Sequence, residues 1–307
     1  MAPADSWDPT HLPSQSGKTI VVTGGNAGIG YFVSEQLASA GARVVLASRS
    51  EQKADTAAAS IRARVPGATV DFVQLDLSSL GSVREAAAKI RNLGGVDVLI
   101  NNAGATSGSS KRQTTEDGLE FVVGSNAFGP FALTALAFPA LTRDARVVSL
   151  GSMATRLVKL DARNLQSTEG RYNFFRAYAY SKHAMHAFAL ELQRKLSASG
   201  SAIESLLAHP GSAVDLRSAK RPGINDGGVK ALDILSAVIS QGKDKGAWPI
   251  VRASIDPAAK GGEFYGPHRS VAGRPVLLEP VKSSASEEFG ADFWRQAEAA
   301  TGITFEP

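Results

Sequence analysis

The sequence predicts an α/β fold in which helices cover both faces of one parallel, doubly wound sheet of about seven strands. Short apolar runs alternate with helical stretches of about 10 to 15 residues, the pattern of repeated βαβ units. A glycine-rich turn joins the first apolar run to the first helical stretch. Polar residues follow several of the predicted strands directly. Because ligands of open α/β sheets bind beyond the carboxyl ends of the strands, we expect these residues to line one crevice.

The first βαβ unit carries a glycine turn that is typical of dinucleotide-binding sites. Residues 18–23 predict a buried strand, and Ile29, Val33 and Leu37 recur every four residues, as on one face of a helix. The glycines between them allow a tight turn, close approach of a pyrophosphate to the backbone, and packing of the helix on the sheet. The helix start offers free N–H groups to the phosphates. The cofactor contacts expected here are Gly24, Asn26, Gly28, Ile29 and Gly30.

The residues after the second strand bear on the choice of nicotinamide cofactor. Residues 42–48 predict this strand, and sites that prefer NAD place a carboxylate near its end, on the ribose hydroxyls. Ser48, Arg49 and Ser50 stand there instead, and the first acid is Glu51. A guanidinium suits a 2′-phosphate and would not replace the carboxylate. We therefore expect NADP(H) and a contact from Arg49; the alternative is a solvated arginine at a strand end.

The third and fourth strands, predicted over residues 69–75 and 96–101, also run into polar residues. Asp76, followed by Leu77, can accept a hydrogen bond from an adenine amino group. Its competing role is to cap the next helix, which Ser78 or Ser79 would do better. Helices are expected over residues 50–64 and 79–93, and the fourth strand leads into Asn102, Ala103 and Gly104.

A long helix and a fifth strand follow. Residues 115–141 predict one helix, kinked at Pro130. Asn126 lies inside it, and asparagine is a poor helix former, so this position needs a reason. Residues 145–150 predict the fifth strand, which ends at Gly151 and Ser152.

The helix predicted over residues 177–196 carries a tyrosine and a lysine that can act together. Tyr178 and Lys182 are four residues apart, a spacing that places both side chains on one helix face. A nearby ammonium stabilises a phenolate and would lower the tyrosine pKa from about 10, toward the range of a general acid or base. The alternative is a pair of ordinary surface residues, because the spacing alone is common.

The C-terminal third has weaker signals. Residues 202–208 predict a sixth strand, followed by His209, Pro210 and Gly211. Residues 212–228 read as a mobile substrate loop beside the crevice. The remaining expected elements are a helix over 229–239, a short seventh strand over 263–266, and an extension over 267–307 with a helix at 285–300. No linker stands out, so we expect a single domain over residues 1–307 with an N-terminal arm over residues 1–17.

Composition excludes several classes of function. The chain has 307 residues and no cysteine, so it has no disulfide or thiol nucleophile. Its five histidines show no metal-site spacing, and a metal is not expected. The net charge of +4 is small and scattered, which argues against nucleic acid. No signal peptide and no run of about 18 apolar residues is evident, so we expect a cytoplasmic protein without a membrane span.

Taken in order, these motifs resemble those of the short-chain dehydrogenase/reductases, over about residues 17–267. The residues that carry the resemblance are 23–30, Asp76-Leu77, 101–104, Asn126, Ser152, Tyr178 with Lys182, and 209–211. The resemblance implies a Rossmann-type fold with strand order 3-2-1-4-5-6-7, of the short single-domain branch. The C-terminal tail, with Phe293-Trp294 and Thr301-Gly302, is similar to the retinol-dehydrogenase-like group.

The resemblance also implies a role for each motif. Tyr178 would be the acid or base, Lys182 would lower its pKa and bind the nicotinamide ribose, and Ser152 would hydrogen-bond the substrate oxygen. Asn126 would hold a water that links Lys182 to solvent. Residues that would support or shape the cofactor site are Asn102, Ala103, Gly104, Pro210 and Gly211. Gly151 stands in place of a second serine, a tolerated variation that does not move Ser152. Ala105-Thr106 stands in place of a bulkier apolar residue, a departure that concerns the shape of the substrate pocket.

These roles predict an NADP(H)-dependent oxidoreductase that interconverts a carbonyl and an alcohol on a small, apolar substrate. Two alternatives are a reductase of an activated C=C bond and a non-catalytic NADP(H)-binding protein of the same fold. The aromatic residues that hint at an apolar substrate can equally pack the core; they are Phe174, Phe175, Trp248, Phe264 and Trp294. By resemblance, a homodimer or homotetramer would form through the helices of Asn126 and Tyr178.

Overall fold

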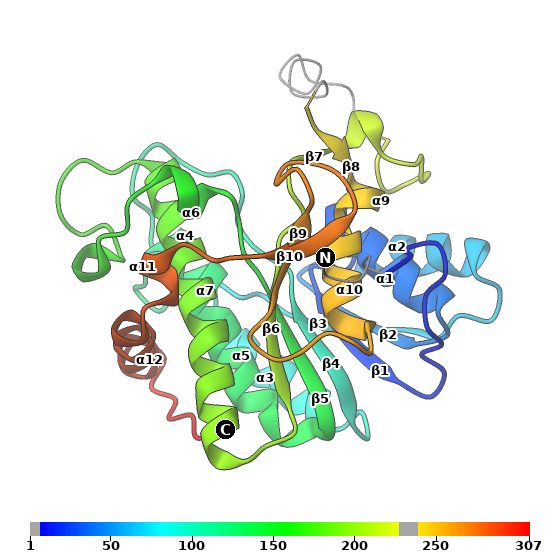
Figure 1. Cartoon of the computed structure of the whole chain (residues 1–307), viewed down its shortest axis with the longest axis horizontal. Coiled ribbons are helices and arrows are strands. Elements are labelled where there is room, and N and C mark those ends of the chain that lie inside the picture. The colour runs from blue at the N-terminus through cyan, green and yellow to red at the C-terminus, as the bar shows by residue number, and fades with distance from the viewer. Residues whose placement is uncertain (1–6, 227–238) are drawn as a thin grey trace, which may run out of the picture.

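The computed structural model describes residues 7–226 and 239–307, and its centre is an eight-stranded sheet covered by helices on both faces (Figure 1). The strand order is β10-β9-β6-β5-β4-β1-β2-β3, and every neighbouring pair is parallel except β9 and β10. The predicted order 3-2-1-4-5-6-7 is confirmed, with β9 as the seventh strand. The strands are β1 Thr19–Thr23, β2 Arg43–Ser48, β3 Val70–Gln74, β4 Val96–Asn101, β5 Leu141–Leu150, β6 Glu204–Ala208, β9 Phe264–Pro267 and β10 Pro275–Leu278.

The central strands are apolar throughout because both of their faces are buried. In β1, Ile20 and Val22 belong to the apolar cluster under α1, α2 and α10, whereas Val21 packs on the other face with residues of α3 and α5. Successive side chains of a strand point to opposite faces, which explains this division. The main helices are α1 Gly28–Ser39, α2 Glu51–Arg64, α3 Leu80–Arg91, α5 Gly129–Ala137, α7 Phe174–Ser199, α10 Trp248–Ile255 and α12 Glu287–Thr301.

The long helix before β5 differs from its prediction in two ways. It begins at Phe121 rather than at residue 115, because the Glu120 carboxylate caps it by accepting from the N–H groups of Val122 and Val123. Its pitch also changes at Asn126 rather than at Pro130. The segments are α4 Phe121–Val123, a π-helical turn η1 Gly124–Phe128, α5, and a 3₁₀ turn η2 Phe138–Ala140.

This helical run is the one described segment that is long and apolar enough to cross a membrane, which the sequence was not expected to contain. It spans Phe121–Ala140, and 78% of its most apolar window is buried inside the protein. It lies between the sheet and the outer helices, as a core helix does, so its apolar character is explained by packing.

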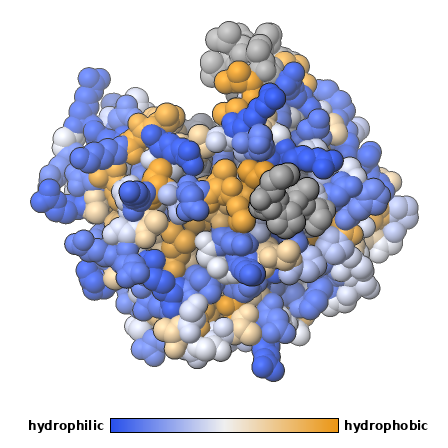
Figure 2. Space-filling model, in the orientation of Figure 1, coloured by the Kyte–Doolittle hydropathy of each residue, from blue (hydrophilic) through white to orange (hydrophobic). Residues whose placement is uncertain are grey.

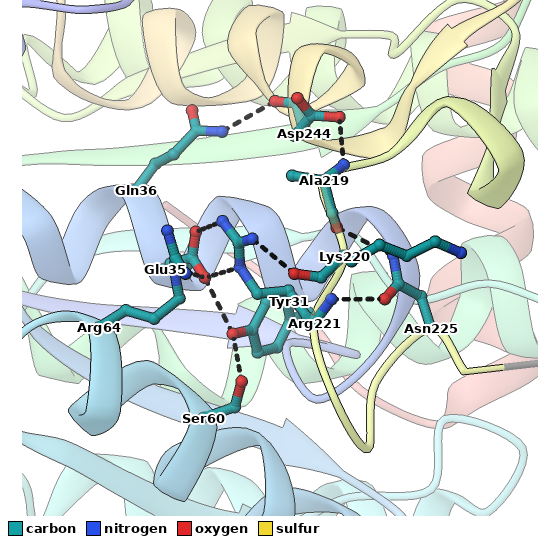
Figure 3. Close-up of polar contacts among 10 residues, drawn as sticks. All are labelled: Tyr31, Glu35, Gln36, Ser60, Arg64, Ala219, Lys220, Arg221, Asn225 and Asp244. Carbon is teal, nitrogen blue, oxygen red and sulfur yellow. Dashed lines mark hydrogen bonds and ion pairs between the residues drawn. The ribbon is translucent and has the colours of Figure 1, made fainter.

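Most of the predicted substrate loop, residues 212–226, is docked on the outside of α1 (Figure 3). The strands β7 Ala213–Val214 and β8 Gln241–Gly242 pair in parallel at its base, next to the turn η4 Asp215–Arg217. Arg221 then reaches Glu35 of α1, donating from Nε at 2.6 Å and from Nη2 at 2.7 Å. Both side chains are about nine-tenths buried. The helix predicted over residues 229–239 falls almost entirely outside the described residues.

The C-terminal extension adds the eighth strand and a covering helix. β10 turns back antiparallel on β9. The sequence pattern did not predict this edge strand, because β9 ends at Pro267 and β10 begins at Pro275. The short helix α11 Lys282–Ala285 and then α12 follow, close to the predicted helix over 285–300. The α12 residues Phe293 and Trp294 pack on Phe128 and Phe131 at ring distances of 5.9 and 5.2 Å.

Because α12 covers α5 and α7, it occupies the face where a subunit contact through the Asn126 and Tyr178 helices was expected. The N-terminal arm is also less free than predicted. From Trp7 it lies against the body, and the Trp7 ring is buried with the Arg252 guanidinium 6.0 Å away.

Candidate active site

A cavity of about 780 Å³ opens at the carboxyl edge of the sheet. It collects fourteen predicted site residues from the whole length of the chain: Gly24, Asn26, Gly28, Ile29, Gly30, Arg49, Asp76, Leu77, Asn102, Ala103, Gly104, Tyr178, Lys182 and Pro210. At the end of the molecule where β5 leads into α6 Ala154–Leu157 and β6 leads into β7, Figure 2 shows a notch with hydrophobic residues on both sides.

The glycine turn after β1 has the backbone geometry that its sequence predicts. Gly24 and Gly28 have φ angles of +65° and +56°, which other residues rarely adopt. A Cβ on Gly30 would run into the Gly24 carbonyl and the Asn102 amide. At Gly28 nothing lies within 4 Å of such a Cβ, so the backbone here is bare toward the cavity. A diphosphate can therefore approach the N-terminus of α1 closely, which is the fit that a dinucleotide requires.

Thr23 ties this turn to the end of β4, a role that the sequence analysis missed. Its hydroxyl oxygen accepts hydrogen bonds from the backbone N–H groups of Asn102 and Ala103, both at 2.9 Å. The Asn102 side chain in turn donates to the Thr23 carbonyl at 2.7 Å. The two cofactor motifs are thus one hydrogen-bonded unit. A polar residue at the last position of an apolar strand was the signal available.

The ends of β2 and β3 form the second part of the cavity. Arg49 is exposed beside it, and Lys53, from the first turn of α2, lies near. The Asp76 carboxylate faces the same space and accepts from the Ser78 N–H and hydroxyl, at 2.9 and 2.7 Å. Ser79, not Asp76, caps α3, as expected.

Charge along the cavity is strongly one-sided. Four cationic side chains line it, and among the described lining residues the only carboxylate is that of Asp76. Two of the cations were not singled out from the sequence: Lys53 and Lys243. Lys243 lies on the opposite wall, at the start of the short helix α9 Lys243–Gly246, where its ammonium is 2.5 Å from the Asp215 carboxylate. Such a lining suits a ligand that carries several negative charges.

Tyr178 lines the cavity and lies near Ser152, which does not itself line it, although 26 positions separate the two residues in the chain. Burial raises the pKa of Tyr178 above 10, and this outweighs the opposite effect of the nearby Ser152 side chain. The prediction that Lys182 lowers this pKa is therefore wrong for this structure. The phenol is therefore protonated at neutral pH.

Lys182 is held one helical turn further along α7. Its side chain is buried, and its ammonium donates to the Leu150 carbonyl at 2.9 Å while lying 5.9 Å from the centre of the Tyr178 ring. Burial lowers the pKa of Lys182 from 10.5 to about 8. The lysine is therefore fixed by the end of β5, close to the tyrosine but not bonded to it.

Asn126 supports the site from behind and does not line the cavity. Its side chain accepts from the Ala105 N–H at 2.6 Å and donates to the Ala105 carbonyl at 3.1 Å. It also donates to the Ser181 hydroxyl at 3.1 Å. This asparagine therefore joins the segment after β4 to the helix of Tyr178, which explains a poor helix former in a π-helical turn. Its expected role in holding a water stays a prediction.

Two glycines near the site are required by neighbouring protein atoms and not by a ligand: a buried histidine ring in one case and the backbone in the other. A Cβ on Gly151 would collide with the His186 ring, so a serine cannot stand there beside this histidine. Burial lowers the pKa of His186 to about 3, so that ring is neutral. Gly211 was expected to line the cavity, but it does not. With φ of +69° it lets the chain pass close to the Val271 carbonyl.

None of the five aromatic residues expected near the substrate lines the cavity. Phe264 and Trp294 are buried in the core, and Phe175 is half exposed. Other residues line the cavity instead. The sequence singled out three of them as departures from the family pattern, namely Ala105, Thr106 and Gly151, but not Ser107, Phe121, Ser125 and Leu150.

Comparison with known proteins agrees with this geometry. The family model of short chain dehydrogenases matches residues 18–217. Polyprenol dehydrogenase of Mus musculus is 35% identical over 96% of this chain and 87% of its own length. Retinol dehydrogenase 13 of Homo sapiens is 41% identical over 64% of this chain and 59% of its own length.

Solved structures of similar proteins superpose on most of this chain. An uncharacterised protein from Mycobacterium paratuberculosis superposes with a TM-score of 0.79 at 34% identity, covering 97% of this chain and 98% of that one. A short chain dehydrogenase from Burkholderia cenocepacia, solved in complex with NADP, gives a TM-score of 0.63 at 25% identity, covering 82% of this chain and 96% of the other.

Proposed function

Because the chain belongs to the short-chain dehydrogenase family, we propose that it is an NADP(H)-dependent oxidoreductase that interconverts a carbonyl and an alcohol, with Tyr178 as the acid or base. The observation that carries this proposal is the proximity of the Tyr178 and Ser152 side chains beside the cavity. It assembles a proton donor and a group that can hold a developing oxyanion. A bound nicotinamide would supply or accept the hydride.

In this proposal, each residue of the site has a separate role in the reaction. Ser152 holds the substrate oxygen, and Tyr178, kept protonated by its raised pKa, gives it a proton during reduction. Lys182 places a cation near both, and the Leu150 carbonyl fixes its position. The reverse reaction needs the phenolate, so oxidation should be favoured at alkaline pH.

We propose NADP(H) and not NAD(H) because its additional 2′-phosphate is negatively charged and the cavity is lined with cations. The cations Arg49 and Lys53 stand where β2 ends, and no acid occupies the place of a carboxylate for the ribose hydroxyls of NAD. The names of the relatives support an apolar substrate: polyprenol and retinol are both alcohols of isoprenoid chains. We propose an isoprenoid alcohol or its aldehyde. That the protein is cytoplasmic and forms dimers or tetramers remains a prediction from the sequence.

The test is turnover of NADPH with an isoprenoid aldehyde such as retinal. Tyr178→Phe should lower kcat by about 10²- to 10⁴-fold, the usual effect of removing a general acid, while NADPH still binds. The matched control is Tyr180→Phe, on the same helix, which has Ala184 four residues on and not a lysine. It should keep most of the activity. Full turnover by Tyr178→Phe would overturn the mechanism.

A further inference from the structure

The large exposed apolar side chains do not line the cavity, but most of them lie close to its lining residues along the chain. The described residues include five strongly exposed ones, and four of these lie in the segments that flank the cavity. We call these four residues the mouth rim: Leu157, Phe175, Leu216 and Ile239, with exposed fractions of 73%, 47%, 40% and 63%. The fifth, Leu277, is 56% exposed on β10.

The mouth rim comes from both sides of the opening. Leu157 ends α6, five residues after Ser152, and Phe175 lies one turn before Tyr178 on α7. Leu216 lies in η4, three residues after the cavity residue Ala213, and Ile239 precedes β8 on the same side. Figure 1 places α6 and the β7–β8 pair on opposite sides of the same end of the molecule.

Cations accompany these apolar residues. Arg156 precedes Leu157 and Arg217 follows Leu216, and both arginines are exposed. Apart from Arg221, which is buried against Glu35, the flanking segments contain nine lysines and arginines against five aspartates and glutamates; these segments are residues 153–176, 212–226 and 239–246. This surplus of four equals the net charge of +4 of the whole chain, so the net positive charge is concentrated in these segments.

Single exposed apolar residues are normal on soluble proteins and by themselves mean little. Here they coincide with the opening of a cavity and alternate with cations. Apolar residues that insert shallowly, beside basic residues that attract anionic headgroups, are the features of an interfacial lipid-binding surface.

We propose that the mouth rim docks on the surface of an anionic phospholipid bilayer. In the docked orientation the cavity opens toward the lipid, so a long apolar alcohol can enter without crossing water. The route of the alcohol rests on the proposed function, whereas the docking itself does not. The attachment is peripheral: it uses side chains at the edge of a folded domain and no membrane-spanning helix.

Binding is tested by sedimentation with vesicles of phosphatidylcholine, with and without phosphatidylglycerol. The wild-type protein should bind the anionic vesicles, and less so at high salt. Leu157→Ser combined with Leu216→Ser should weaken binding about tenfold, because two leucines no longer insert. The matched control is Leu277→Ser, which removes an exposed leucine of β10 that does not belong to the mouth rim and should bind as the wild type does. Both proteins should unfold at the wild-type temperature, since the positions are exposed.

Turnover then separates docking from catalysis. The Leu157→Ser/Leu216→Ser protein should lose about tenfold in rate on a long-chain isoprenoid alcohol carried in anionic vesicles. On a short, water-soluble isoprenoid alcohol it should match the wild type. A wild-type protein that binds vesicles but turns over neither alcohol would refute the proposed function and leave the docking intact.

Three outcomes would overturn the docking. One is no binding of the wild type to anionic vesicles. Another is equal loss of binding in the Leu277→Ser control. The last is a concentration-dependent dimer that the Leu157→Ser/Leu216→Ser change abolishes in the absence of lipid binding, which would assign the mouth rim to a second copy of the chain.

Discussion

The cavity has two walls, and the chain builds them in different ways. The first wall comes from the ends of β1, β2, β3 and β4, where short turns place backbone and glycines. The second wall comes from the segment after β6 and carries Pro210, Ala213 and Lys243. Side-chain contacts hold it on α1: Arg221 to Glu35, 186 positions away, and Gln36 to the Asp244 carbonyl at 2.8 Å (Figure 3).

The two walls are therefore sensitive to different kinds of substitution. The first wall depends on the absence of side chains, so any added atom disturbs it. The second wall depends on a buried ion pair, so it should respond to the loss of one charge. Leaving a buried charge without its partner is among the most costly single changes in a folded protein.

The largest expected effect is therefore on the second wall. Glu35→Gln should lower the free energy of unfolding by about 3 kcal/mol, because the Arg221 guanidinium stays buried without its carboxylate. Denaturant unfolding measures this loss, and hydrogen exchange should rise in residues 213–226.

An exposed ion pair provides the control for this change. Asp292 pairs with Arg295, which is 70% exposed, and Asp292→Asn should cost less than about 1 kcal/mol. If Glu35→Gln were as stable as the wild type, with unchanged exchange in residues 213–226, the second wall would not depend on this ion pair.

On the first wall, Gly30→Ala should lower the free energy of unfolding by about 1–3 kcal/mol, the usual cost of overpacking. The added Cβ would meet the Gly24 carbonyl and the Asn102 amide, so the turn must shift and nucleotide affinity should fall too. Gly81→Ala, in the first turn of α3, is the control. Its Cβ has an ordinary contact of 3.6 Å with Ser79, and alanine should stabilise the helix by about 1 kcal/mol. A stable, nucleotide-binding Gly30→Ala protein would refute the steric account.

The two walls also differ in how far the sequence predicts them. Most of the first wall was predicted residue by residue, because Gly24, Asp76 and Asn102 each follow a recognisable strand directly; Lys53 and the role of Thr23 were not predicted. On the second wall, Pro210 alone was predicted as a site residue that lines the cavity, and the rest was predicted as a mobile loop. Its docking depends on Arg221 meeting Glu35, and neither residue carries a local signal, since a charged residue on a helix or in a loop is ordinarily solvated.

Similar limits apply to the catalytic centre. The spacing of Tyr178 and Lys182 is local and was predicted correctly as a helical pair. The sign of the Tyr178 pKa shift was not, because it depends on burial, which the tertiary structure sets. Gly151 was read as a variation of the motif, and only its contact with His186 explains it.

Lys182, between the two walls, makes stability depend on pH. Its pKa is about 8 in the folded protein and 10.5 ordinarily, so between these values the unfolded chain holds more protons. Stability should therefore rise with pH across this window. Relative to Lys182→Met, the wild type should gain about 1–2 kcal/mol between pH 8 and about pH 9.5. The control is the exposed Lys89→Met, whose unfolding free energy should run parallel to that of the wild type. Parallel curves for Lys182→Met would show that the lysine is not desolvated.

The smallest expected effects distinguish the walls by the part of the cofactor that each contacts. Under the proposed function, Arg49 on the first wall would meet the 2′-phosphate, so Arg49→Gln should raise the Kd of NADPH about tenfold and leave that of NADH unchanged. Lys243 on the second wall would face the diphosphate, which both cofactors share, so Lys243→Gln should raise both Kd values by the same factor, about fivefold.

The control for Lys243 is Lys245→Gln on the same short helix, where the side chain is exposed and does not line the cavity. It should leave both Kd values unchanged. If Lys243→Gln weakened the binding of NADPH alone, both walls would contact the 2′-phosphate. If it weakened the binding of neither cofactor, the ammonium would serve only to pair with Asp215. The second wall would then act on the nucleotide through its shape and not through its charge.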